Sequence, residues 1–215
     1  QGLITVAEGV SLQAGDEIVL LEDDFPSNQI PWWRQQRRGA RLVPVPRDSA
    51  GRVTAEAVLA RVGERTRVVA VSWVAFDNGY RMDLRALGVG LAARNARATA
   101  AGVRPAFLCV DAIQGLGALP LDVRACGIDF LSADSHKWLL GLEGIGLFFC
   151  RQDRIEALDP PFLSWWSLAK PFAPWTPDAP LQPSARRWEY ACLPTIELFG
   201  LEASLEMLQR AGLER

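Results

Sequence analysis

Four polar residues in the middle of the chain have the types and the spacing to act together on one ligand. Asp111 and Gln114 lie in the run FLCVDAIQGLG, and His136 and Lys137 lie in the run DFLSADSHKWLLG. A lysine amine can attack a carbonyl carbon, and a carboxylate can keep a nearby ring nitrogen protonated. Amide and imidazole groups can bond oxygen atoms. The set therefore predicts a site that binds an aldehyde with a basic ring.

Pyridoxal 5'-phosphate (PLP) is a ligand of this kind. It needs a lysine for its aldehyde, an anion beside its pyridine nitrogen, and donors for its ring oxygen and phosphate. An opposite charge in contact moves a pKa by about 1–3 units, or roughly 1.4–4 kcal/mol, which is enough for Asp111 to hold a pyridinium proton. Each residue alone also has an ordinary interpretation, such as a helix cap for Asp111 or a solvated side chain for Lys137. The combination favours PLP.

The elements around these residues predict where the ligand would lie. The apolar run Phe107–Val110 is typical of a strand buried on both faces, and it ends at Asp111. Ligands of open α/β sheets bind outside the carboxyl ends of the strands. We therefore expect Asp111, Gln114 and the segment that follows Asp129–Leu131 to converge.

The order of the elements predicts an α/β fold with a mostly parallel sheet. The expected strands are Glu17–Leu21, Arg41–Pro46, Arg67–Ser72, Phe107–Val110, Asp129–Ser132 and Gly144–Cys150. The expected crossover helices include Ala55–Val62 and Leu84–Ala101. Later in the chain, Ile196, Phe199, Ala203 and Met207 share one helical face, and seven prolines between Asp159 and Pro183 exclude long regular elements there.

The ordered motifs resemble the class V aminotransferases, a family that includes cysteine desulfurases, kynureninases and isopenicillin N epimerase-like proteins. The resemblance rests on Asp111-x-x-Gln114, on Ser135-His136-Lys137-Trp138, and on the glycine-rich stretch that leads into Gly144–Cys150. It implies a three-layer PLP-dependent transferase large domain of fold type I. It also implies an enzyme that acts on an amino acid through a Lys137 aldimine, as an aminotransferase or a cysteine desulfurase-like protein.

The same resemblance implies a role for each site residue. Asp111 would pair with the pyridine nitrogen, Gln114 would bond the ring oxygen, His136 would contact the phosphate, and Lys137 would form the Schiff base. The segment DDFPSNQIPW resembles the stretch that stacks a side chain on the cofactor ring, which would place Phe25 there. An ordinary core phenylalanine is an equal alternative for Phe25.

The chain departs from the desulfurase pattern at several positions. Desulfurases usually stack a histidine where this chain has Phe25, and they carry Ser-Asn where it has Ala75-Phe76. These differences favour a kynureninase-like or epimerase-like activity as the alternative. Asp134 replaces a phosphate-binding serine. It is expected to turn away from the phosphate, which a carboxylate repels, and to orient His136 or a backbone group. Cys192 replaces a threonine that reaches the phosphate of a neighbouring subunit, so this contact is not expected here.

Composition limits the other classes of function. The chain has 215 residues, of which 49% are hydrophobic, so it can form one large domain, and its net charge of −2 gives no basic footprint for nucleic acid or a membrane. The four cysteines lie far apart with a single histidine, so no metal site or disulfide framework is expected. No signal peptide or spanning segment is found, and a cytoplasmic location is expected.

Competing nucleotide motifs are absent from the sequence. No phosphate loop or nucleophile elbow is present. Gly115 and Gly117 follow a strand, but Pro120 takes the place of the third glycine of a dinucleotide fingerprint.

The two ends of the chain suggest a partial domain. Residues 1–7 resemble the middle of a family helix, and the last helical pattern continues to Arg215. We therefore expect residues 1–215 to form a partial PLP-binding large domain, without its N-terminal segment and its C-terminal small domain. The whole protein is expected to be a homodimer. A non-catalytic truncated domain that binds PLP weakly is the second class of hypothesis.

Overall fold

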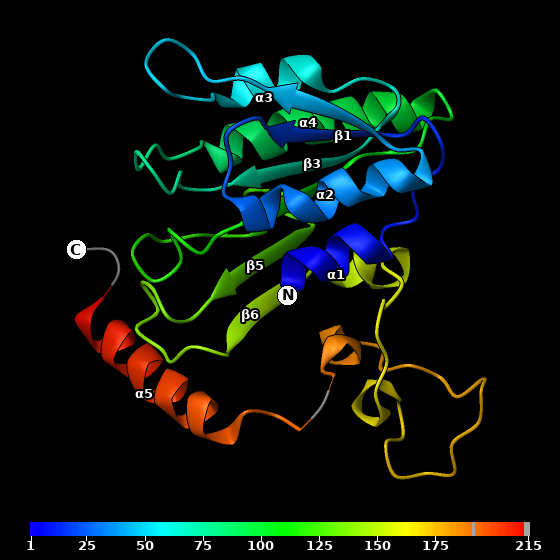
Figure 1. Cartoon of the computed structure of the whole chain (residues 1–215), viewed down its shortest axis with the longest axis vertical. Helices are drawn as coiled ribbons and strands as arrows, with labels where there is room; N and C mark the ends of the chain where they lie inside the picture. The colour runs from blue at the N-terminus through cyan, green and yellow to red at the C-terminus, as the bar shows by residue number, and fades with distance from the viewer. Residues whose placement is uncertain (191, 213–215) are drawn as a thin grey trace.

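A six-stranded sheet organises the chain (Figure 1). The computed structural model describes residues 1–190 and 192–212. Along the sheet the strand order is β2-β1-β3-β4-β5-β6, and all neighbours are parallel except β5 and β6. The strands are β1 (Glu17–Leu21), β2 (Arg41–Val45), β3 (Thr66–Ser72), β4 (Phe107–Asp111), β5 (Phe130–Asp134) and β6 (Gly146–Cys150). This confirms the mostly parallel α/β sheet.

Helices cover both faces of this sheet. The α-helices are α1 (Gly2–Gly9), α2 (Ile30–Arg34), α3 (Ala55–Arg61), α4 (Leu84–Ala100) and α5 (Thr195–Ala211). Short 3-10 helices span Pro26–Asn28, Gln35–Arg38, Gln152–Ala157, Trp165–Ser167 and Ala185–Trp188. One apolar core lies between the sheet and α3 and α4, and a second lies between the sheet and α1 and α2. The expected three layers are therefore present.

The sequence of each layer explains its packing. All seven residues of β3 are buried, because helices cover both sides of this central strand. Thr54 begins α3 by accepting a hydrogen bond from the Ala57 N–H, and Asp83 begins α4 by accepting one from the Ala86 N–H. Within α4, Gly88 lies against the Cys126 carbonyl, where a β-carbon would not fit. The helix can therefore approach the chain that leads into β5.

The predicted boundaries of the strands lie within two residues of the observed ones, and β5 extends past its expected end at Ser132 to Asp134. β6 begins at Gly146, because Gly144 adopts a left-handed turn with φ of 88°. No helix begins at Ala112, and the chain after Asp111 makes only one helical turn, in which the Leu116 N–H donates to the Ala112 carbonyl at 2.9 Å. The helix-cap interpretation of Asp111 is therefore wrong.

The C-terminal third has little regular structure before α5. The proline-rich segment contains only the short helix Trp165–Ser167, as its prolines predict. Helix α5 lies apart from the two helical layers (Figure 1). It buries Leu201, whereas the apolar face that contains Ile196 and Phe199 is exposed. The helix ends at Ala211, and the expectation for Arg215 lies outside the described residues. In the described part of the chain, no helix is both long and apolar enough to cross a membrane.

Candidate active site

Three polar residues form a row across the carboxyl ends of the central strands. Ser72 on β3 is the register partner of Asp111 on β4, and Asp111 is the register partner of Ser132 on β5. Partners in a parallel register point to the same face of a sheet, with the strands about 4.8 Å apart. The row faces α1 and α2, because Ala70, two residues before Ser72, belongs to the core beneath these helices.

Asp111 is the buried anion of this row. Only 7% of the residue is exposed, and its Oδ1 accepts a hydrogen bond from the Ile113 N–H at 3.0 Å. The pKa of Asp111 is raised to about 6, mainly by burial. The hydrogen bond from the Ile113 N–H opposes this rise, the nearby Asp24 and Asp134 add to it, and Lys137 opposes it. Among the described residues, no cationic side chain forms an ion pair with Asp111. The site therefore suits a ligand that brings its own positive charge.

Lys137 approaches the same site from the loop after β5. The lysine is half-buried, and its Nζ atom lies 5.7 Å from the centroid of the Phe25 ring. Its electrostatic effect on the pKa of Asp111 places the amine and the carboxylate in one neighbourhood. The structure thus brings together a lysine, a buried aspartate and an aromatic ring from three separate segments.

The loop that carries Lys137 is held by its own backbone and by its neighbours. The Ser135 hydroxyl donates to the Leu142 carbonyl at 2.6 Å, and the Gly141 N–H donates to the Ser135 carbonyl at 2.9 Å. Leu140 adopts a left-handed conformation with φ of 56°, which is strained for a leucine. From α5, the Ser204 hydroxyl donates to the Leu140 carbonyl at 2.7 Å. The position of Lys137 therefore depends on the packing of α5 as well as on β5.

A pocket of about 290 Å³ opens over the row. Phe25 and Ile30 line one wall, and Asp111, Ser132 and Asp134 line the sheet side. An adjoining pocket of about 350 Å³ contains His136 together with Thr5, Ser132 and Asp134. Because Ser132 and Asp134 line both pockets, the two form neighbouring parts of one region.

The other predicted site residues differ in their exposure and in the pockets that they line. His136 is exposed in the adjoining pocket, where a phosphate could reach it. Gln114 is half-buried in the turn after Asp111 but does not line the pocket over the row. Asp134 is exposed and lines both pockets, and no hydrogen bond among the described residues links it to His136. Its expected turn away from a bound phosphate stays a prediction.

Asp24 is a buried residue of the site that sequence reasoning missed. Its carboxylate is 8% exposed and accepts hydrogen bonds from Ser72, from Asn28 and from the Phe25 backbone. The spacing of four residues between Asp24 and Asn28, just after a strand, was the only signal in the sequence. This spacing did not distinguish Asp24 from its acidic neighbours Glu22 and Asp23.

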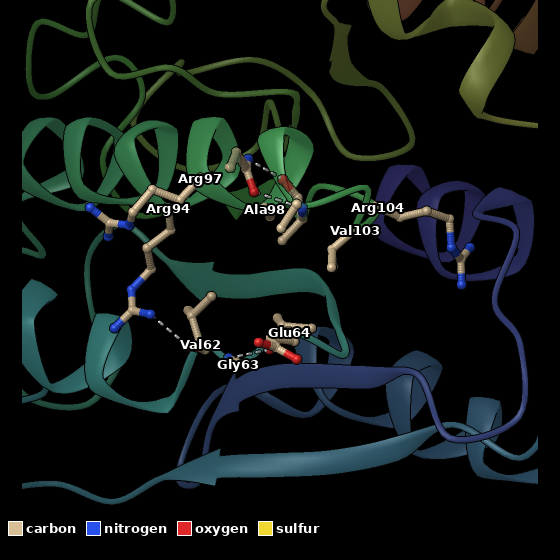
Figure 2. A pocket seen from close by; sticks show the side chains of 12 residues that line it. Val62, Gly63, Glu64, Arg94, Arg97, Ala98, Val103 and Arg104 are labelled. Atoms are coloured by element: carbon tan, nitrogen blue, oxygen red, sulfur yellow. Dashed lines mark hydrogen bonds between the residues drawn. The ribbon is translucent and has the colours of Figure 1, made fainter.

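A separate pocket of about 360 Å³ lies at the opposite, amino-terminal edge of the sheet (Figure 2). Figure 2 shows Arg94 turned toward Val62, whose carbonyl accepts its hydrogen bond at 2.9 Å. Asn95 bonds both the N–H and the carbonyl of Ala106. These polar groups already bond the backbone, so they serve to hold the end of α4 to the neighbouring loops.

The donor set over the row fits PLP. Asp111, which is buried and forms no ion pair within residues 1–190 and 192–212, suits a pyridinium. The Lys137 amine suits an aldehyde, and the aromatic face of Phe25 suits a planar ring. His136 offers a hydrogen bond to a phosphate in the adjoining pocket, whereas the Thr5 hydroxyl in that pocket already bonds the Tyr190 hydroxyl at 2.9 Å. Neither Gln114 nor Lys137 lines the pocket over the row, so the predicted contacts of these two residues with the cofactor stay predictions.

The fold is that of the large domain of PLP-dependent transferases of fold type I. The chain belongs to the aminotransferase class-V family, which it matches over residues 1–215. It is 30% identical to a probable cysteine desulfurase of Methanothermobacter thermautotrophicus, over 98% of this chain and 49% of that protein. The isopenicillin N epimerase of Streptomyces clavuligerus is 33% identical over 74% of this chain and 39% of its own length.

A solved structure has the same fold along nearly the whole chain. The apo structure of the cysteine desulfurase from Thermococcus onnurineus NA1 is 25% identical and superimposes with a TM-score of 0.84, over 99% of this chain and 50% of that one. The chain therefore spans about half the length of the relatives that it matches.

Proposed function

We propose that the protein is a PLP-dependent enzyme that acts on an amino acid, with Lys137 as the residue that binds the cofactor covalently. The observation that supports this most strongly lies at the carboxyl edge of the sheet. There the Lys137 amine lies beside Phe25 and lowers the pKa of the buried Asp111, which forms no ion pair among the described residues. When bound, PLP supplies an electron sink for negative charge at the Cα atom of an amino acid. The family match supports the same class of chemistry.

Each residue of the site would make a distinct contribution. Asp111 would keep the pyridine nitrogen protonated, because a buried carboxylate with a raised pKa gains most from a cationic partner. Once released from the cofactor, the Lys137 amine would act as the general base at the Cα proton. Phe25 would cover the ring and exclude water from that side, but it cannot carry a proton. Gln114 would bond the ring oxygen, and His136 would bind the phosphate.

Two classes of activity are candidates for the reaction that follows activation of the Cα atom. The desulfurase-like or aminotransferase-like activity is supported by the relatives named cysteine desulfurase. An epimerase-like or kynureninase-like activity is favoured by one specific observation, the contact between Phe25 and Phe76. Their ring centroids lie 5.4 Å apart with an interplanar angle of 69°. This aromatic pair gives the site an apolar wall where desulfurases have polar groups.

We also propose that the whole protein dimerises in the cytoplasm. The exposed apolar face of α5, with Phe199 at 67% and Ile196 at 76% exposure, supports a protein partner for this helix. A domain that binds PLP without turnover is the non-catalytic alternative for the 215-residue chain on its own.

A panel of substrates tests the proposed function. The whole protein, loaded with PLP, is incubated separately with cysteine, kynurenine and simple amino acids. Sulfide, the cleavage product, the keto acid and the inverted amino acid are each measured. Turnover of one substrate that is lost in Lys137→Ala supports the proposal. Cofactor binding without any turnover supports the non-catalytic alternative, and failure to bind PLP contradicts the proposal.

A further inference from the structure

A second buried carboxylate lies beside the candidate site. Asp24 follows β1, and its Oδ1 accepts hydrogen bonds from the Ser72 hydroxyl at 2.6 Å and from the Phe25 N–H at 2.7 Å. Its Oδ2 accepts one from Asn28 Nδ2 at 2.9 Å. Asn28 is itself buried and accepts a long hydrogen bond from Trp32 Nε1 at 3.4 Å. The Asp24 carboxylate therefore accepts three hydrogen bonds, from a hydroxyl, a backbone N–H and an amide.

The bonds of Asp24 reach two parts of the site. Through the Phe25 N–H it fixes the residue whose ring faces Lys137. Through Ser72 it reaches the row of strand ends, where Ser72 is the register partner of Asp111. The single hydroxyl proton of Ser72 goes to Asp24 and is therefore not available to Asp111. The buried carboxylates of Asp24 and Asp111 therefore lie at the same end of the sheet. The Ser72 hydroxyl, which belongs to the row, donates its hydrogen bond to Asp24.

The charged groups around Asp111 favour a cation at this place. Asp24 and Asp134 each raise the pKa of Asp111, after burial as the largest cause, and Lys137 is the cation that lowers this pKa. Asp24 is one of the carboxylates that raise the pKa of Arg47, but the Arg47 guanidinium bonds Asp77 at the surface. In the described part of the chain no ion pair involves Asp24. The negative charge of Asp24 is therefore not neutralised by an ion pair with a described residue, and it acts on Asp111.

We propose that Asp24 is a positioning residue of the site, which fixes Phe25 and Ser72 by hydrogen bonds and supplies a second negative charge behind Asp111. Asp24 acts on a bound cofactor through Asp111: the two carboxylates together hold a proton on a ring nitrogen more strongly than Asp111 alone. This inference rests on the proposed function for the identity of the ring. The effect of Asp24 on the pKa of Asp111 does not require the cofactor.

The test compares Asp24→Asn with Asp23→Asn in the whole protein. Both variants remove one negative charge, but the side chain of Asp23 is 67% exposed whereas that of Asp24 is buried. In the cofactor-free protein, the pKa of the Asp111 carboxyl is followed by ¹³C NMR. Asp24→Asn is expected to lower it by about one unit, and Asp23→Asn to change it by much less, because solvent screens an exposed charge. Equal shifts in the two variants would overturn the inference.

A second readout uses the cofactor-loaded protein. Asp24→Asn is expected to lower the pH at which the visible absorbance of bound PLP changes, and Asp23→Asn is expected to leave it unchanged. If wild-type protein binds no PLP, the proposed function fails, but the NMR comparison still decides the role of Asp24. If PLP binds and the two variants titrate alike, Asp24 only holds the loop in place and the inference is wrong.

A third variant keeps the test decisive if Asp24→Asn does not fold. The double variant Asp24→Asn/Asn28→Asp exchanges the two hydrogen-bonded partners, so the buried network keeps one carboxylate and one amide. The negative charge then sits one side chain further from Ser72. The pKa of Asp111 is expected to fall between those of wild type and an uncharged network. A pKa above the wild-type value would contradict the inference, because the nearer charge would then have the weaker effect.

Discussion

The Nζ atom of Lys137 lies 5.7 Å from the centroid of the Phe25 ring, although the two residues are far apart in the sequence. Phe25 belongs to the chain after β1, and Lys137 to the loop after β5. The parallel sheet brings these two carboxyl ends to the same edge. An ammonium at this distance from an aromatic face gains about 0.5–1 kcal/mol at an exposed site. This contact therefore holds the amine beside the ring of Phe25, which lines the pocket over the row.

Asp111 lowers the stability of the cofactor-free protein near neutral pH. Because burial raises its pKa from 3.8 to about 6, the folded state binds this proton more tightly than the unfolded chain. The stabilisation that this tighter proton binding gives the folded state is fully present below about pH 4 and is lost as the pH rises through about 6. Asp111→Asn is expected to raise the free energy of unfolding at pH 7.5 by about 1–3 kcal/mol, and by much less at about pH 4.

Urea unfolding of both proteins at these two pH values checks this prediction. The variant keeps an oxygen that can accept the Ile113 N–H, so the comparison isolates the charge. A variant less stable than wild type at the higher pH would show that Asp111 has a cationic partner. The same variant is expected to lose most of its activity, since an amide cannot hold the pyridinium proton electrostatically.

Gly117 sets the position of the Lys137 loop. It has φ of 97°, and a β-carbon there would collide with the backbone carbonyl of Trp138, next to Lys137. Gly117→Ala is expected to cost about 1–3 kcal/mol from backbone strain and to weaken PLP binding by about tenfold, the equivalent of ~1.4 kcal/mol. Equilibrium binding of PLP measures the second effect.

Gly102→Ala is the matched control for this change. Gly102 also has a positive φ, of 71°, but no atom lies within 4 Å of the position that an added β-carbon would take. This variant is expected to lose stability while it keeps the wild-type affinity for PLP. Equal affinities in the two alanine variants would mean that the contact with Trp138 does not position the loop.

Phe76 offers a test of the substrate class. Its ring is 46% exposed and packs edge to face against Phe25. An aromatic pair contributes about 0.5–1.5 kcal/mol, so Phe76→Ala is expected to reduce kcat/KM for an aromatic amino acid by about 2–12-fold. Cysteine in the same assay is the internal control, because it has no ring to lose contact. A larger loss with cysteine than with the aromatic substrate would favour the desulfurase-like activity.

The strands and the central residues of the site could be predicted because they depend on local patterns. Short apolar runs that end in Asp111 and before His136 indicate both the sheet and its functional edge. The network of Asp24 could not be predicted, because Glu22, Asp23 and Asp24 are adjacent carboxylates and only the tertiary packing buries the third.

The buried face of helix α5 could not be predicted from the sequence either. Its sequence contains two apolar stripes, one with Leu201 and one with Phe199. Helical periodicity identifies both stripes but does not show which of them packs against the loop of Lys137. The structure buries Leu201 and leaves Phe199 exposed.

The most direct test of the proposed chemistry is to identify the residue that PLP labels. The whole protein is incubated with PLP, its visible absorbance is recorded, and the mixture is reduced with borohydride and mapped by peptide mass. We expect a single label on Lys137 that is absent from Lys137→Ala, while the far-ultraviolet circular dichroism of that variant is unchanged. A label on Lys170, the other lysine of the chain, or no stable label in the folded protein, would contradict the assignment of Lys137.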